Sequence, residues 1–227
     1  MPTVVFASPK GGAGKSTSAV LLGTQLAASG AEVTIIDADP NRPVARWSKL
    51  PGKPDSLTVI ADVTEKTVIR VIDEEAARVA FVIVDLEGTA SRMIPYAMSR
   101  ADLVIIPTRG SVLDAVEAVS AIREVRQQEE AFRRRIPAAV LFTCTSAAIR
   151  PRTLGSIAGE FAANGVPVLK TRLHDREAFR ALFSFGGTLA SLDKSSVRNI
   201  PAALANAQAL AEEVVSVLRS NRAGQAA

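Results

Sequence analysis

The sequence is poor in the residues that form disulfides and metal clusters. Among its 227 residues there is one cysteine, Cys144, and one histidine, His174. A single cysteine excludes a disulfide within the chain, and no Cys/His cluster has the spacing of a zinc site. We therefore expect a protein of the reducing cytosol whose fold needs no covalent staple.

Long apolar runs and a strong excess of one charge are also missing. No apolar stretch approaches the ~20 residues of a membrane-spanning helix, and no signal peptide is recognisable. The net charge is +4, from 27 Lys and Arg against 23 Asp and Glu. We expect no membrane partner, and this mild basicity is as compatible with an ordinary protein surface as with a polyanionic partner.

Hydrophobic residues make up 48% of the sequence but aromatic residues only 4%. A core of Val, Ile, Leu and Ala favours parallel strands covered by helices. We predict one α/β domain over residues 1–219 with a doubly wound, mainly parallel β-sheet, followed by a short polar tail over residues 220–227. The pattern predicts strands at 3–7, 32–37, 56–61, 80–85, 101–107, 137–143 and 166–169, and helices at 18–28, 64–78, 111–131, 151–164 and 201–219. The helix at 111–131 has a predicted buried stripe of Val112, Val116, Val119, Ile122 and Val125.

A glycine-rich segment, residues 8–17, separates the first predicted strand from the first predicted helix. Its glycines leave backbone N–H groups free to surround phosphate oxygens, and the following helix directs its positive end at the same anion. Lys15 adds a charge for the β- and γ-phosphates, and the Ser16 hydroxyl is placed to bind Mg²⁺. The predicted nucleotide-binding residues are Gly11, Gly12, Ala13, Gly14, Lys15, Ser16 and Thr17.

Three aspartates follow predicted strands. Asp37 and Asp39 come at the end of the second strand, and Asp85 closes an apolar strand in a Walker B pattern. Because ligands of open α/β sheets bind at the carboxyl ends of strands, these carboxylates should face the same crevice as the glycine-rich segment. We predict that Asp37 and Asp85 hold Mg²⁺.

The glycine-rich segment is not the ordinary phosphate loop, because Pro9 stands where that motif has a glycine. It fits the variant Lys-Gly-Gly-x-Gly-Lys-Ser/Thr, in which Lys10 is a second lysine. This resembles the deviant Walker A loop of the ParA/MinD superfamily, and residues 37–41 resemble the Asp-x-Asp-Pro-Gln switch segment of that superfamily. The closest group is the short plasmid-partition ParA proteins. Residues 86–89 depart from the Pro-Pro of many relatives, although Gly88 still permits a phosphate-sensing N–H.

The resemblance implies an ATPase that uses ATP and Mg²⁺ and dimerises face to face around two nucleotides. It implies slow hydrolysis, stimulated by a small ParB-like DNA-binding adaptor, and sequence-independent DNA binding by a cytoplasmic, nucleoid-associated protein. Lys10 would cross to the phosphates of the other subunit, Lys15 would hold its own, and Asp39 would position the attacking water. Thr143 is a candidate for the base pocket, because relatives place adenine near the end of that strand.

Several residues outside these motifs have less specific interpretations. The basic segment 172–198 is a candidate DNA contact, and the alternative is the Arg133, Arg134 and Arg135 run at a helix end. We interpret Trp47 as a cap over the core, Glu87 as a solvated loop acid, and His174 with Asp175 and Arg176 as surface or structural residues.

Other functions remain open for a chain with these motifs. A MinD-like membrane-cycling ATPase needs a basic amphipathic C-terminal helix, and the two glutamates at 212–213 argue against one. An iron–sulfur carrier of this fold needs bridging cysteines, which one Cys144 does not supply. A metabolic ATPase, an ATP-dependent polymerising scaffold and a DNA-transfer accessory ATPase would share the same loop.

Overall fold

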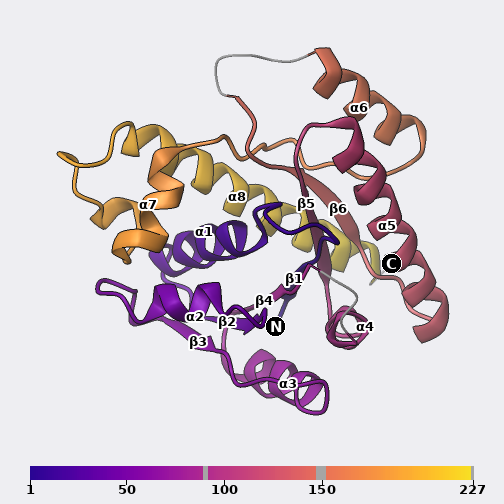
Figure 1. The fold of residues 1–227 in the computed structure, drawn as a ribbon. Coiled ribbons are helices and arrows are strands. Elements are labelled where there is room, and N and C mark those ends of the chain that lie inside the picture. The colour runs from indigo at the N-terminus through magenta and orange to yellow at the C-terminus, as the bar shows by residue number, and fades with distance from the viewer. Residues whose placement is uncertain (89–91, 147–151, 226–227) are drawn as a thin grey trace.

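The computed structural model describes residues 1–88, 92–146 and 152–225. These residues form a parallel sheet of six strands in the order β3-β2-β4-β1-β5-β6 (Figure 1), which confirms the doubly wound α/β fold. Each boundary of these six strands lies within two residues of its prediction. The strands are β1 (Thr3–Phe6), β2 (Val33–Ala38), β3 (Leu57–Ile60), β4 (Phe81–Leu86), β5 (Leu103–Thr108) and β6 (Ala138–Phe142).

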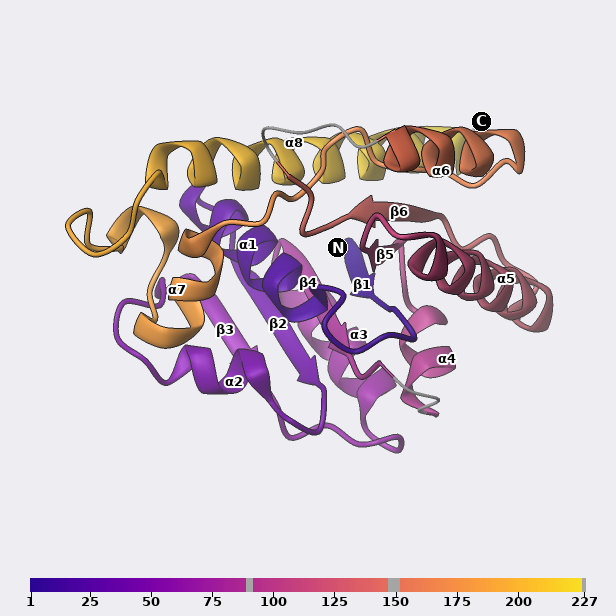
Figure 2. The same cartoon turned by 45° about the horizontal axis from the view of Figure 1, so that its top comes forward.

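Helices cover both faces of the sheet (Figures 1 and 2). One apolar cluster packs α1, α2, α7 and α8 against one face, and a second packs α3, α4, α5 and α6 against the other. Successive residues of β1 alternate between the clusters, since Val4 and Phe6 belong to the first and Val5 to the second. Burial on both faces explains why the strands read as continuous apolar runs. The helices are α1 (Lys15–Ala28), α2 (Pro43–Ser48), α3 (Val68–Arg78), α4 (Met93–Met98), α5 (Val112–Phe132), α6 (Arg152–Ala163), α7 (Glu177–Phe185), the 3₁₀ turn η1 (Leu189–Ser191) and α8 (Ile200–Gln225).

Three helix boundaries differ from the predictions by more than one residue. Helix α3 begins at Val68, not at residue 64, because residues 65–67 form a turn. Helix α1 begins at Lys15, not at residue 18, because Gly14 adopts a left-handed conformation (φ 91°) that passes directly into the first turn. Helix α8 continues to Gln225 and so includes most of the segment expected to be a polar tail.

Two other predictions were wrong. Residues 166–169 form no strand; they make one parallel bridge, Val140 to Val168, along the edge of β6. In α5, Val116 is 64% exposed, because the α5 face that meets the sheet carries Ala115 and Ala118 in its place.

None of the helices in the described residues is long and apolar enough to span a membrane.

The loop after α2 packs closely against the loop after α7, and we call this contact the loop junction. The Trp47 side chain is 1% exposed, as expected for a cap over the core, and its indole N–H donates to the Gly187 carbonyl at 3.2 Å. Gly186 ends α7 with φ 80° and ψ −164°, a conformation that strongly favours glycine. A Cβ atom on Gly186 would lie 2.4 Å from Leu50 Cβ and 2.8 Å from the Pro51 carbonyl oxygen. This close approach fixes α7 beside α2.

We expect Gly186→Ala to lower the free energy of unfolding by about 2–4 kcal/mol, from backbone strain and the clash with Leu50. Urea denaturation followed by circular dichroism measures it. Gly155→Ala is the matched control, because nothing lies within 4 Å of a Cβ at that helical position. The control should be neutral or stabilise by up to ~1 kcal/mol. Equal free energies of unfolding for the two variants would show that the loop junction does not need a glycine at position 186.

Candidate functional site

A cavity of about 630 Å³ opens at the carboxyl ends of the strands. The glycine-rich loop between β1 and α1 forms its floor, as predicted from the strand–loop–helix order. The walls come from the loops that follow β2, β4, β5 and β6 and from the start of α7. The predicted site residues on its lining are Gly11, Gly12, Gly14, Lys15, Ser16, Thr17, Asp39 and Thr143.

Two glycines and a threonine shape the loop. Gly12 and Gly14 both have positive φ, 72° and 91°, which turns the chain tightly enough to form a concave surface. The Thr143 hydroxyl donates to the Ala13 carbonyl at 2.7 Å, and so ties the loop to the end of β6. Ala13, although part of the loop, is buried and does not line the cavity. Thr143 therefore supports the loop and also borders the cavity in which we predicted a base pocket.

Lys15 lies in the first turn of α1 and is 6% exposed. Among the described residues, its ammonium donates two hydrogen bonds, both long, at 3.4 Å to the Ser8 carbonyl and 3.3 Å to the Lys10 carbonyl. Burial lowers the pKa of Lys15, and the charge of Asp85 opposes that shift. A Cβ on Gly88 would lie 3.1 Å from the Lys15 Nζ, so this glycine lets the loop after β4 pack onto the ammonium. A poorly satisfied buried cation at a helix N-terminus is suited to an anion.

Asp85 is buried at the end of β4, and among the described residues neither of its carboxylate oxygens has a hydrogen-bond partner. Burial raises its pKa from the ordinary 3.8 to about 7. An orphaned carboxylate a short distance from the phosphate loop fits a bound cation. Asp85 itself is fully buried and does not line the cavity, whereas Ser16 does, and the nearby Ser16 hydroxyl opposes the rise in the Asp85 pKa. These two side chains fit the Mg²⁺ expected from the sequence.

Asp37 and Asp39 have different surroundings. The Asp37 carboxylate is buried and accepts hydrogen bonds from the backbone N–H of Ala45 at 2.8 Å and of Asp39 at 3.3 Å. It thus fixes the turn into α2, and its role as a metal ligand stays a prediction. Asp39 lines the cavity, and its carboxylate accepts from the Asn41 N–H at 2.8 Å. Asp39 is therefore the member of the pair that faces a ligand.

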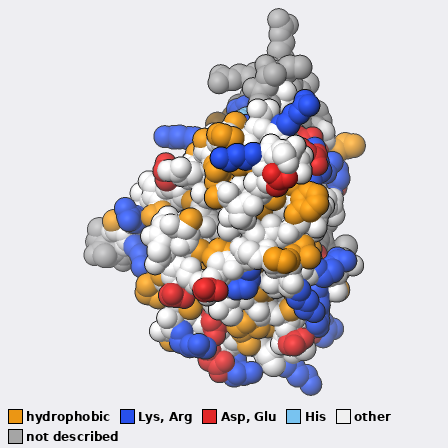
Figure 3. Space-filling model, turned by 90° about the vertical axis from the view of Figure 1, so that its left-hand side faces the viewer, with side chains coloured by type: hydrophobic (Ala, Val, Ile, Leu, Met, Phe, Trp, Pro, Cys, Tyr) orange, Lys and Arg blue, Asp and Glu red, His pale blue; other side chains and the backbone are white. Residues whose placement is uncertain are grey.

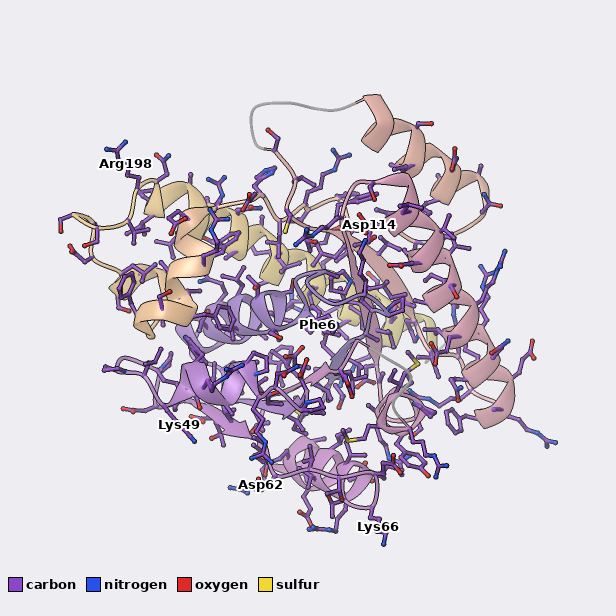
Figure 4. The ribbon with its side chains drawn as sticks, viewed as in Figure 1. Phe6, Lys49, Asp62, Lys66, Asp114 and Arg198 are labelled. Atoms are coloured by element: carbon purple, nitrogen blue, oxygen red, sulfur yellow. The ribbon has the colours of Figure 1, made fainter. Side chains whose placement is uncertain are left out.

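Lys10 does not line the cavity. Its ammonium lies 2.5 Å from Asp114, the third residue of α5, and the Ser111 hydroxyl donates to the same carboxylate at 2.6 Å. The hydrogen bond to Asp114 raises the pKa of Lys10. Figure 4 shows Asp114 at the start of α5, and the exposed side chains of Leu113 and Val116 flank it in sequence. The outward lysine predicted from the motif is thus held by a carboxylate of its own subunit.

The far wall of the cavity was not predicted. It includes Leu173, His174, Asp175, Arg176 and Phe179. His174, expected to be a surface or structural residue, lies on the cavity because its backbone bridges to Thr145 beside the end of β6. Its Nδ1 lies 2.9 Å from the Thr145 hydroxyl, and burial lowers its pKa. No motif marks this wall, since the segment reaches the cavity only through tertiary pairing.

Comparisons with known proteins identify the family of the chain. The family model described as VirC1 protein matches residues 1–220. The chain belongs to the VirC1 family. It is also 45% identical, over 96% of its length and 98% of the relative's, to a protein named ParA from Rhizobium radiobacter. These matches confirm the expected membership of the ParA/MinD superfamily of ATPases.

Two solved structures share the fold. A plasmid partition protein of Borrelia burgdorferi, solved with AMPPNP bound, superposes with a TM-score of 0.69 at 16% identity and covers 95% of this chain and 98% of its own. The MinD cell division protein of Aquifex aeolicus gives a TM-score of 0.69 at 18% identity over 94% of this chain and 98% of its own.

We expect Asp85→Asn to stabilise the nucleotide-free protein by about 1–3 kcal/mol at pH 8, where a neutral amide replaces a buried, unpaired carboxylate. The folded-state pKa of about 7 lies above the unfolded value of 3.8, so the folded state loses stability as the pH rises between them. The advantage of the variant should therefore shrink at pH 5, where Asp85 is protonated. Urea denaturation at both pH values tests this. Asp62→Asn, at a carboxylate with 92% side-chain exposure, is the control and should have little effect. A destabilised Asp85 variant at pH 8 would contradict the account.

Proposed function

We propose that this protein is a Mg²⁺-dependent ATPase of the ParA type that acts in the partition of plasmid or chromosomal DNA. It would form an ATP-dependent homodimer, bind DNA without sequence preference and hydrolyse ATP slowly under stimulation by a small ParB-like adaptor. The observation that carries the proposal is the glycine-rich loop on the cavity, with the poorly satisfied ammonium of Lys15 beside it and the buried, orphaned carboxylate of Asp85 behind it. The plasmid partition protein with bound AMPPNP supports the choice of nucleotide.

Each residue has a role that follows from its surroundings. The loop amides and Lys15 would bind the phosphates, while Ser16 and Asp85, with Asp37 as a further candidate, would hold Mg²⁺. The metal would neutralise charge that develops on the phosphates. Asp39 would orient the attacking water, because its carboxylate faces the cavity while that of Asp37 is engaged by backbone N–H groups.

The dimer would form on the side of the loop where α5 begins. Lys10 is 42% exposed there, and the apolar side chains of Leu113 and Val116 are 76% and 64% exposed. Exposed apolar groups beside a charged residue are typical of protein interfaces. In the proposed dimer, Lys10 would exchange Asp114 for the phosphates of the partner's nucleotide.

We expect Lys15→Ala to abolish ATP binding by the monomer, since the loop loses its buried cation. Lys10→Ala should leave monomer binding nearly intact but remove dimerisation and hydrolysis, because charge-assisted contacts with buried phosphates are strong. Titration calorimetry measures binding, light scattering with AMPPNP measures dimerisation, and phosphate release measures turnover. A Lys10 variant that dimerises and hydrolyses like the wild type would disprove the cross-subunit role.

Among the candidate DNA contacts, we choose basic residues that have no other role in the proposed site. Arg180 forms ion pairs with Asp175 and Glu177, and Arg176 lines the nucleotide cavity. Lys194 and Arg198, between η1 and α8, are exposed, and Figure 4 shows Arg198 at the outer edge of the molecule. On the face shown in Figure 3, basic side chains are interspersed with acidic and apolar ones. A test of DNA contact should therefore use Lys194 and Arg198, whose replacement leaves the cavity intact.

We expect the double variant Lys194→Glu/Arg198→Glu to weaken ATP-dependent DNA binding equally for unrelated sequences and to reduce its salt dependence. Fluorescence anisotropy with two unrelated duplexes at several salt concentrations measures this. The matched control, Lys49→Glu/Lys66→Glu, makes the same charge change on exposed residues elsewhere (Figure 4) and should bind like the wild type. Unchanged binding by the test variant would move the DNA site, with the run 133–135 as the next candidate. No DNA binding by the wild type at any salt would disprove the partition function.

A further inference from the structure

Arg109 is a cation on the nucleotide cavity that no motif of the sequence marks. It directly follows β5, its side chain is exposed, and it lines the cavity together with Lys15. Its Nη2 donates to the Gly12 carbonyl oxygen at 2.8 Å. The β5–α5 loop thus places a guanidinium directly against the phosphate loop.

The Gly12 carbonyl satisfies one of the several N–H donors of Arg109. Within the described part of the chain it is the one acceptor bonded to this guanidinium, which carries five N–H donors. The partner is a neutral oxygen, whereas a phosphate offers charged oxygens in the bidentate geometry that guanidinium matches. A polyphosphate on the loop would therefore compete successfully for Arg109.

Arg109 and Lys10 are restrained differently. Lys10 is paired with the Asp114 carboxylate and lies off the cavity, whereas Arg109 borders the cavity and has no carboxylate partner among the described residues. This difference favours a nucleotide bound to the same subunit as the ligand of Arg109.

We propose that Arg109 is a phosphate-binding residue that turns from the Gly12 carbonyl onto the polyphosphate chain of the nucleotide held by its own subunit. The inference rests on the proposed nucleotide binding and adds to it a second cation beside Lys15. The site would then take its specificity for polyphosphates from two loops, of which only the first is visible as a motif.

The test is titration calorimetry of the purified full chain with Mg²⁺-AMPPNP, for the wild type, Arg109→Gln, Arg109→Ala and Arg109→Lys. Glutamine keeps a donor for the Gly12 carbonyl but removes the charge. We expect Gln and Ala to weaken binding alike, by about tenfold, and Lys to weaken it less. Arg123→Gln, on an exposed residue of α5 away from the cavity lining, should bind like the wild type. Thermal melts of all variants should coincide with that of the wild type.

Three results would overturn the inference. If only Arg109→Ala weakens binding, the residue tethers the loop and does not touch phosphate. A parallel assay of phosphate release from ATP measures hydrolysis by the same variants. If both neutral variants bind AMPPNP like the wild type but lose hydrolysis, Arg109 acts on the partner's nucleotide. If they bind and hydrolyse like the wild type, Arg109 has no role at the phosphates, although the proposed function stands. A wild type that fails to bind AMPPNP would disprove the proposed function as well.

Discussion

The central position of β1 in the sheet is the constraint on which the candidate site depends. β1 pairs with β4 on one side and β5 on the other, with Phe6 in register with Asp85 and Ile105. The chain that leaves β1 must therefore turn between the ends of both neighbours. One neighbour supplies Asp85, and the other leads to Arg109 and Asp114. The parallel order of the strands thus gathers charges from distant parts of the sequence around a single loop.

The charged groups at the carboxyl ends of the strands lower the stability of the folded protein. Asp85 is buried without a hydrogen-bond partner among the described residues, and Lys15 is buried with two long hydrogen bonds. Groups buried in this way destabilise a fold unless a ligand completes their coordination. The two apolar clusters on either side of the sheet offset that cost. A stable apolar core with poorly satisfied charged groups at the carboxyl ends of the strands is expected of a protein with a binding site there.

Two cations near the outside of the phosphate loop are held in different ways. Asp114 pairs with Lys10, and Ser111 fixes that carboxylate at the start of α5. Arg109, five residues before Asp114, donates to one backbone carbonyl within the described part of the chain. One short loop after β5 therefore sets the starting position of both cations. The same loop leads into α5, where the apolar side chains of Leu113 and Val116 are exposed.

The sequence by itself determined the sheet, the glycine-rich loop and the strand-end aspartates, because these features depend on neighbours within a few residues. Continuous apolar runs predict strands buried on both faces, and the glycines of the loop specify its turn wherever it stands. Only the tertiary structure decided the partners of Lys10 and Arg109, which lie 104 and 97 positions away in the sequence. It also placed His174 on the cavity, exposed Val116 and left residues 166–169 without a strand. Such contacts depend on how whole elements pack, and no local periodicity records which side chain will meet which across the sheet.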